Sequence, residues 1–337
     1  MNCYFDLLNF KEFSKQTVEV STQEQSMACL KMLKKNFDII INDTVYEELE
    51  EEYQILLEEF QSGFEGNLTF VKNFKRNIAI NDSLYLGSII LLDDVDLTNS
   101  LKTKNQILVG SLKEETETLS SLILDDQGFH KEEQIGKDIT PALYININHL
   151  PISKIFIIDR YLFKGPEVGG NLGLFEYNIE KLLKNILYDR RSRIDIILVY
   201  QIHNKTIPNT NKDYDNGPEK QKIVNKIKNL VHKHCPKPNI CMIAVPKGKI
   251  DDEHDRHIIT DYLRIKSGDS FAYFKSNGDI ASKSLFVDFY SHGKKSYKIN
   301  SDVLMSKINT YTNECIDKYA SESYIPKDYN QKDLIVF

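Results

Sequence analysis

Apolar runs and amphipathic segments alternate along the second half of the chain. Three short runs rich in large aliphatic residues cover positions 154–159, 193–200 and 239–245. Such runs, without regular polar alternation, are typical of strands buried on both faces of a parallel sheet. Between them, residues 174–187 and 219–234 repeat apolar positions at helical spacing. The order strand, helix, strand, helix, strand predicts an α/β fold in which all three strands lie parallel in one sheet flanked by helices.

The first half of the chain shows a mixed α/β pattern with shorter segments. The predicted elements are a helix over 23–36, a strand over 37–41, an acidic helix over 45–61, strands within 67–92 and a strand over 106–111. Asn42, Asp43 and Thr44 precede the acidic helix, and these residue types favour the N-cap position. The pattern therefore predicts a second α/β unit ahead of the sheet described above.

A polar, turn-rich segment separates the two halves. It covers residues 125–138, and Pro151 follows shortly after it. We therefore expect an acidic mixed α/β domain over residues 1–150 and a domain with a parallel or mixed sheet over 151–295. An amphipathic pattern after residue 300 predicts a C-terminal helix and tail over 296–337.

Charge is distributed unevenly between the halves. Residues 1–150 hold 13 Lys and Arg against 26 Asp and Glu, which gives −13; residues 151–337 hold 30 against 23, which gives +7, and the two sum to the net −6. A basic half favours an anionic partner. Attraction between the two halves of one chain, or chance segregation of a mixed surface, would explain the same asymmetry without a partner.

The composition is typical of a soluble globular protein, with 41% hydrophobic residues available for a core. No apolar run approaches the roughly 18 residues that a membrane-spanning helix requires. The first ten residues contain no basic group and carry Asp6 within an apolar stretch, so no secretory signal is expected. The five cysteines are an odd number at scattered positions, which predicts reduced thiols and a cytoplasmic location.

The segment from residue 253 to residue 274 carries the candidate chemistry. Alternation predicts a strand in which His254 and Arg256 project from the same face, a turn at Asp261, and a return strand that ends near Ser267. An imidazole and a guanidinium on one strand face suit a tetrahedral oxyanion, because arginine binds phosphate bidentately with a charge that does not titrate.

Further candidate residues lie in the small-residue loop after this hairpin and at the ends of predicted strands. Backbone N–H groups of such a loop can approach an anion. The candidate phosphate-binding residues are Lys247, Lys266, Ser267, Gly268 and Ser270. Asp159 and His203 follow the ends of two predicted strands, where open parallel sheets bind ligands, and are candidate site-lining residues.

His232, His234, Cys235 and Cys241 are metal ligands by residue type. Their spacing matches no common zinc module, and Cys241 begins an apolar strand in which a buried thiol is ordinary. We therefore predict neither a metal site nor a cofactor.

The segment around His254 resembles a signature of the phospholipase D superfamily. That signature consists of His, one residue, Lys, four residues, Asp and, six residues on, Gly-Ser. Here His254, Arg256, Asp261 and Gly268 keep the spacing, whereas an Arg replaces the Lys and an Asp replaces the Ser. The strand and loop look closest to the phospholipase-D-like domain at the C-terminus of MIT-domain proteins, and the resemblance covers about residues 154–290.

The resemblance implies two alternative functions. In the catalytic branch the His is a nucleophile, the cation holds phosphate oxygens, and a second copy of the motif supplies the general acid. His254 and Arg256 would take these roles in a phosphodiesterase or nuclease-like effector, with Asp261 orienting the imidazole. Because the chain holds one copy, catalysis requires a homodimer. In the other branch the domain is not an enzyme and binds nucleic acid, an anionic lipid headgroup or a protein partner. A third interpretation is a salt-bridged hairpin of the same residues with no ligand.

Overall fold

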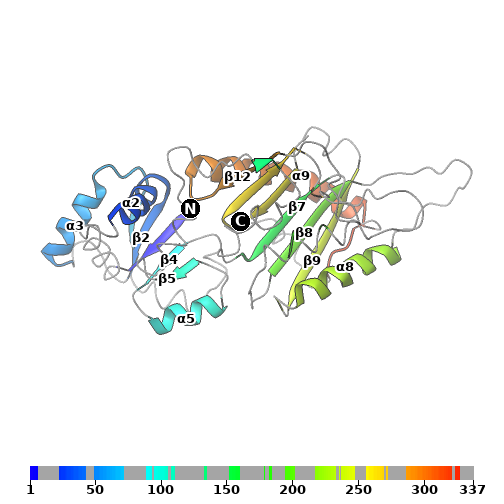
Figure 1. Cartoon of the computed structure of the whole chain (residues 1–337), viewed down its shortest axis with the longest axis horizontal. Helices are drawn as coiled ribbons and strands as arrows, with labels where there is room; N and C mark the ends of the chain where they lie inside the picture. The colour runs from blue at the N-terminus through cyan, green and yellow to red at the C-terminus, as the bar shows by residue number, and fades with distance from the viewer. Residues whose placement is uncertain are drawn as a thin grey trace, which may run out of the picture.

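The computed structural model of the chain is elongated, and two β-sheets occupy opposite ends of its long axis (Figure 1). The structure describes residues 1–6, 23–42, 49–71, 89–92, 95–104, 108–110, 133–134, 152–159, 178, 182–183, 194–201, 217–232, 235, 237–246, 256–268, 271, 286–320 and 323–326. The fold is α/β, as the alternation of apolar runs and amphipathic segments predicts.

The first sheet consists of five parallel strands in the order β3-β2-β1-β4-β5. The strands are β1 (Asn2–Phe5), β2 (Asp38–Asn42), β3 (Leu68–Val71), β4 (Ile89–Leu91) and β5 (Leu108–Gly110). This is the doubly wound order, in which β2 and β3 lie on one side of β1 and β4 and β5 lie on the other. It positions the carboxyl ends of all five strands at one edge of the sheet.

Among the described residues, three helices accompany this sheet in the sequence. They are α2 (Gln23–Asn36), which coincides with the predicted helix, α3 (Glu51–Gln61) and α5 (Val95–Lys104). The acidic helix α3 begins at Glu51 rather than at residue 45, because the backbone at Leu49 and Glu50 is not helical. The Glu50 carbonyl accepts a hydrogen bond from the N–H of Gln54 at 3.1 Å, and the Gln54 side chain donates to the Leu49 carbonyl at 3.1 Å. α3 therefore begins later than predicted, and the predicted N-cap residues Asp43 and Thr44 lie outside the described residues.

The second sheet consists of seven strands in the order β6-β12-β11-β10-β7-β8-β9. The strands are β6 (Glu133–Gln134), β7 (Lys154–Ile158), β8 (Ile194–Gln201), β9 (Pro238–Val245), β10 (Arg256–Thr260), β11 (Leu263–Ser267) and β12 (Phe286–Ser291). β7, β8 and β9 are parallel neighbours, which confirms that the three apolar runs share one sheet. The remaining pairs are antiparallel, so the sheet is mixed. β6 belongs to the turn-rich segment before residue 150, so this sheet includes residues that we assigned to the first domain.

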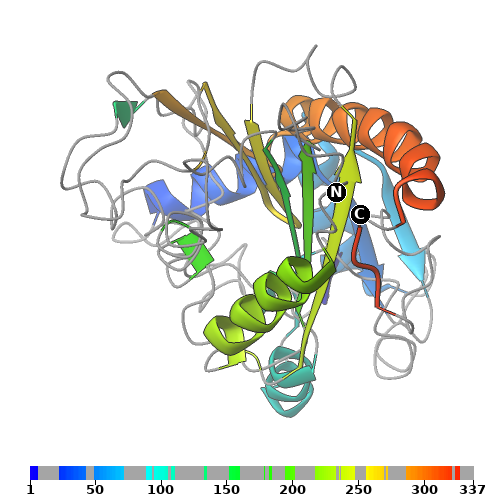
Figure 2. The same cartoon turned by 90° about the vertical axis from the view of Figure 1, so that its right-hand side faces the viewer.

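Of the described helices, α8 (Gly217–His232) and α9 (Lys295–Lys318) cover opposite faces of the second sheet (Figure 2). α8 lies close to the predicted range 219–234, and α9 confirms the predicted C-terminal helix. α8 buries Val224, Ile227 and Val231 against one face. α9 buries a longer stripe on the other face, namely Ser301, Leu304, Met305, Ile308, Tyr311, Thr312, Cys315 and Ile316. Of the helix predicted over 174–187, the described residues 178, 182 and 183 are helical and buried.

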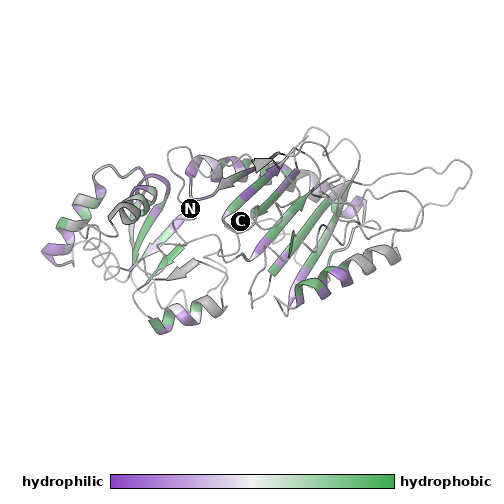
Figure 3. Ribbon diagram, viewed as in Figure 1, coloured by the Kyte–Doolittle hydropathy of each residue, from purple (hydrophilic) through white to green (hydrophobic). Residues whose placement is uncertain are grey.

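The two sheets are joined by a shared apolar core and by a polar contact. One cluster of buried side chains includes residues from strands of both sheets, among them the fully buried Tyr262 between β10 and β11. The N–H of Lys295, at the start of α9, donates to the side-chain oxygen of Asn36, at the end of α2, at 3.0 Å. Figure 3 shows the strands of both sheets as predominantly apolar. None of the described helices has the length and apolar character needed to cross a bilayer.

Candidate functional site

Among the residues that the structure describes, four candidate site residues lie at one edge of the second sheet, namely Asp159, Arg256, Ser267 and Gly268. β7, β8, β9 and β11 end at this edge, and β10, which is antiparallel to β7 and β11, begins there with Arg256. Ser267, the last residue of β11, is the ladder partner of Arg256. Asp159 follows Ile158, whose ladder partner is His257, so Asp159 is the neighbour of Arg256 on the other side. We call this edge, defined by Asp159, Arg256 and Ser267, the Arg256 edge.

Arg256 is held inside the protein, with only 5% of its surface exposed. Its Nη1 donates to the carbonyl oxygen of Gly268 at 3.4 Å, a contact between the start of β10 and the loop after β11. The planar guanidinium has donors that point in several directions, so it can serve a backbone carbonyl and an oxyanion at the same time. Gly268 is exposed, and a Cβ added there would meet nothing within 4 Å, so this part of the loop is open to solvent.

Asp159 attaches the loop after β11 to the same edge. Its side chain has no exposed surface, and Oδ2 accepts a hydrogen bond from the N–H of Phe271 at 2.8 Å. Phe271 is itself 3% exposed. Asp159 therefore lines the Arg256 edge and also fixes the backbone that follows Gly268.

Four candidate residues lie outside the described residues. They are His203, Lys247, His254 and Ser270. In the sequence each lies two or three residues from a strand end at the Arg256 edge: after β8, after β9, before β10 and after β11, respectively. The described strand ends next to them in the sequence all belong to the Arg256 edge.

Lys266 belongs to the opposite face of the sheet from Arg256 and Ser267. Its ladder partners are His257 on β10 and Asp288 on β12. Successive side chains on a strand point to opposite faces, so Lys266 and Ser267 cannot both contact a phosphate on one face. The expectation that Lys266 joins the same phosphate site is corrected on this ground.

Asp261 lies at the other end of β10. Since a strand rises about 3.3 Å per residue, roughly 16 Å separate its Cα from that of Arg256. Asp261 is 2% exposed, and its carboxylate accepts hydrogen bonds from the Ser153 N–H at 2.6 Å, the Ser153 hydroxyl at 2.8 Å and the Lys154 N–H at 3.1 Å. Burial raises the pKa of Asp261, and the hydrogen bonds from Ser153 and Lys154 oppose that shift. Asp261 is thus a structural acceptor that ties the β10–β11 turn to the start of β7, not a carboxylate behind an imidazole at the Arg256 edge.

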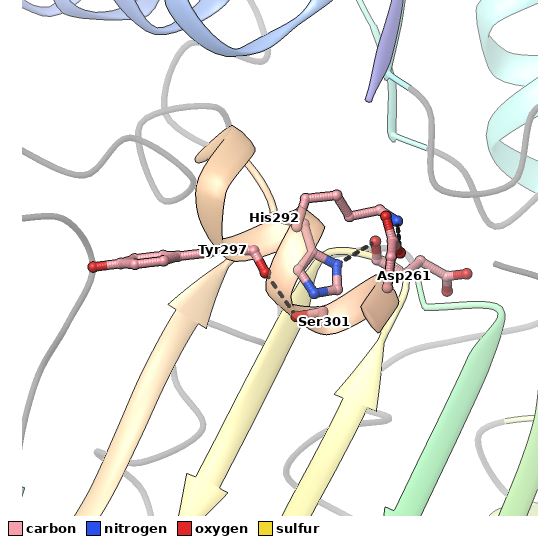
Figure 4. Close-up of polar contacts among 6 residues, drawn as sticks. Asp261, His292, Tyr297 and Ser301 are labelled. Atoms are coloured by element: carbon pink, nitrogen blue, oxygen red, sulfur yellow. Dashed lines mark hydrogen bonds and ion pairs between the residues drawn. The ribbon is translucent and has the colours of Figure 1, made fainter. Parts of the chain in front are cut away.

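His292, which no sequence motif singles out, completes this second polar cluster (Figure 4). It follows β12, is 2% exposed, and its backbone N–H donates to the Tyr262 carbonyl at 2.9 Å. The ring Nδ1 lies 3.0 Å from the Asp261 carbonyl oxygen; because a carbonyl only accepts, Nδ1 carries the proton. Burial lowers the pKa of His292 to about 3, so the ring is neutral. Within the described part of the chain, Nε2 has no hydrogen-bond partner.

The first sheet has a ligand-binding position of its own by topology. The strand order reverses at β1 and β4, and sheets of this order bind ligands outside the carboxyl ends of their strands at that point. Asp6 follows β1 there, is 4% exposed, and donates its N–H to the Leu91 carbonyl at 2.8 Å. Local sequence pattern does not indicate that Asp6 lies at this point of the sheet, because the order of strands in a sheet is set by non-local pairing.

The cysteines do not assemble into a described metal site. All five are buried, and no disulfide joins any two of them. Burial raises the pKa of Cys241 to about 12, which disfavours the thiolate that binds metals, and His232 is exposed. No group of three His, Cys, Asp or Glu side chains that could hold a metal ion is found among the described residues.

Comparison of the sequence with models of protein families finds no matching family, and a search of curated proteins finds no similar protein. The resemblance to the phospholipase D superfamily therefore depends on the spacing of His254, Arg256, Asp261 and Gly268 and on the pattern around them.

Proposed function

We propose that this chain recognises a phosphate ester or phosphodiester at the Arg256 edge. The observation that carries the proposal is the Arg256 guanidinium, buried where four strands end and an exposed glycine loop begins. A bidentate charged hydrogen bond to phosphate requires an arginine held in place, and the contact with the Gly268 carbonyl supports this. The carboxyl ends of parallel strands are also where open α/β sheets bind ligands.

The charge of the second half supports an anionic ligand. Residues 151–337 carry 30 basic against 23 acidic side chains. This excess raises the local concentration of a polyanion and is screened by salt. Recognition of a phosphate-bearing polymer or nucleotide therefore fits both the site and its surroundings.

Hydrolysis at the same edge is a second candidate function, and the position of His254 favours it. His254 precedes Arg256 by two residues, so on a continued β10 its imidazole would project from the same face. A phosphohistidine mechanism needs a general acid for the leaving group. With one motif in the chain, that acid would come from a second copy in a homodimer. The distance of Asp261 from this edge favours recognition without turnover.

The test measures binding and turnover of the full chain in the presence of a chelator. The ligands are inorganic phosphate, cyclic nucleotides, single-stranded DNA and RNA, and a chromogenic phosphodiester. We expect Arg256→Gln to weaken binding by about 10- to 150-fold, because a charged hydrogen bond contributes about 1.5–3 kcal/mol. Arg256→Lys should bind with an affinity between those of the wild type and Arg256→Gln, since lysine keeps the charge and loses the bidentate geometry. Lys237→Gln is the control, because it removes an exposed charge before β9, at the opposite edge.

The outcomes separate the two functions. Turnover that His254→Ala abolishes while binding persists would assign hydrolysis. Binding without turnover, lost in Arg256→Gln and kept in Lys237→Gln, would assign recognition alone. Equal weakening by Arg256→Gln and Lys237→Gln would show that the edge is not the binding site.

A further inference from the structure

A second polar surface lies on the face of the second sheet opposite Arg256. Arg264 and Lys266 of β11 are half-buried there and pair across the ladder with Tyr290 and Asp288 of β12. On the same face, the described apolar cluster beneath α9 includes residues of β7 to β10 and none of β11 or β12. The sheet face therefore changes from apolar to charged and aromatic at β11.

Cations and aromatic rings alternate on this surface. The Arg264 guanidinium lies 4.4 Å from the centre of the Tyr290 ring. The Tyr290 ring meets the Tyr297 ring of α9 edge to face, with centres 5.2 Å apart and planes at 87°. The Lys294 ammonium lies 4.5 Å from the centre of the Tyr297 ring. We call these four residues, Arg264, Tyr290, Lys294 and Tyr297, the Tyr290 platform.

Both rings are partly accessible, and the Tyr290 ring is uncharged. Tyr290 and Tyr297 are half-buried, and in Figure 4 the Tyr297 ring projects away from His292. Burial raises the pKa of Tyr290 to about 12, and the neighbouring Asp288 adds to the shift. The Tyr290 hydroxyl donates to Asp288 Oδ2 at 3.2 Å, so its proton already has an acceptor. The platform therefore presents two partly accessible rings, of which Tyr290 is neutral, beside positive charges.

The start of α9 adds positive charge in an unfavourable place. Lys294 is the N-cap residue and makes no side-chain cap hydrogen bond, Lys295 follows it, and the first turn contains no acidic residue. The positive end of a helix dipole disfavours cations and favours anions. Lys298, one turn on, forms an ion pair with Asp302. An anion bound beside Lys294 and Lys295 would offset this repulsion, which indicates the charge of the ligand.

We propose that the Tyr290 platform binds single-stranded nucleic acid, independently of the phosphate site at the Arg256 edge. A base would stack on a ring face that the edge-to-face pair of Tyr290 and Tyr297 leaves open, while phosphates lie near Arg264, Lys294 and Lys295. Aromatic rings on a sheet surface flanked by cations are the features that hold single strands, because every base offers a π-face and every nucleotide a charge. The same reasoning predicts little sequence preference.

The test is fluorescence anisotropy of labelled oligo-dT and oligo-U with the full chain at low salt. We expect Tyr297→Leu to weaken binding by about 5- to 150-fold, the effect of losing one stacked base. Tyr297→Phe keeps the ring and should bind like the wild type. Lys294→Gln should weaken binding. It should also make the plot of log binding constant against log salt concentration less steep, by about 0.7 for one lost phosphate contact. Lys318→Gln is the matched control, because Lys318 also lies over a tyrosine, Tyr319, at the far end of the same helix.

Several results would overturn the proposal. They are the absence of oligonucleotide binding by the wild type, equal weakening by Lys318→Gln and Lys294→Gln, and unchanged binding by Tyr297→Leu. Tighter binding to vesicles containing phosphatidylserine than to either oligonucleotide, lost in the same variants, would assign the surface to a membrane instead. Lys294→Gln keeps both rings, so it provides a test even if Tyr297→Leu loosens α9. Arg256 lies on the other face of the sheet. Tyr297→Leu should therefore weaken oligonucleotide binding by the same factor when it is introduced into the Arg256→Gln variant, so each proposed site can be refuted without the other.

Discussion

Replacement of Asp261 by alanine should destabilise the protein strongly, although Asp261 lies far from the Arg256 edge. Its buried carboxylate accepts three hydrogen bonds, two from Ser153 and one from the Lys154 N–H, at 2.6 to 3.1 Å. A hydrogen bond to a charged group contributes about 1.5–3 kcal/mol, and a buried donor left without an acceptor costs about 1–3 kcal/mol. Three bonds that share one carboxylate are not additive, so we expect the free energy of unfolding to fall by about 3–6 kcal/mol.

Ser153→Ala provides the matched comparison. It removes only the hydroxyl bond at 2.8 Å and keeps both backbone N–H bonds to Asp261, so the expected loss is about 1.5–3 kcal/mol. Urea unfolding followed by circular dichroism measures the free energy of unfolding of both variants. The values can be compared if the slope of this free energy against urea concentration is the same as in the wild type. A loss of less than about 1 kcal/mol for Asp261→Ala, or a loss no larger than that of Ser153→Ala, would refute the structural role of this carboxylate.

Three further predictions test the packing and the buried histidine. His292 has a pKa of about 3 in the folded protein and about 6.5 in the unfolded chain, so the neutral ring contributes fully to the free energy of unfolding above pH 6.5, and this contribution falls by about 1.4 kcal/mol per pH unit as the pH drops toward 3. His292→Gln should flatten this pH dependence, which urea unfolding at several pH values measures. An equally steep pH dependence in the variant would argue against a buried neutral ring. Gly66→Ala should lower the melting temperature, since a Cβ at Gly66 would collide with a backbone carbonyl next to α2, whereas Gly268→Ala should be tolerated; the reverse order would contradict the local geometry. On α9, Ile308→Ala should cost about 2–5 kcal/mol and the exposed Ile299→Ala less than about 0.5 kcal/mol, and similar values for both would mean that the helix buries a different face.

The core of the second sheet could be predicted because its strands carry a local signal. β7, β8 and β9 are buried on both faces, so each appears as an apolar run in the sequence. β6 has only two residues and depends on pairing with β12, which no local pattern encodes. The predicted start of α3 was too early for a related reason: residues with good N-cap character precede the helix, but the chain bends at Leu49 and the helix begins only at Glu51.

The candidate site was predictable only as far as strand direction allows. Arg256 and Ser267 could be expected near each other, because a tight hairpin brings its two outer ends together. Arg256 and Asp261 are close in the sequence, but they lie at opposite ends of the extended strand β10 and are therefore far apart in space. His292 was missed because its contact with Asp261 spans 31 residues and depends on β12 reaching the same end of the sheet.

The most direct test of phosphate recognition at the Arg256 edge is an NMR titration of the isotope-labelled full chain with a phosphodiester. We predict that the largest chemical-shift changes occur at the Arg256 side-chain N–H and at the backbone amides of Ser267, Gly268 and Phe271. These chemical-shift changes should saturate over the same range of ligand concentration as the binding of the phosphodiester measured in solution. Saturable binding with changes confined to the Asp261 and His292 end of the sheet, and none at Arg256, would contradict the proposed site.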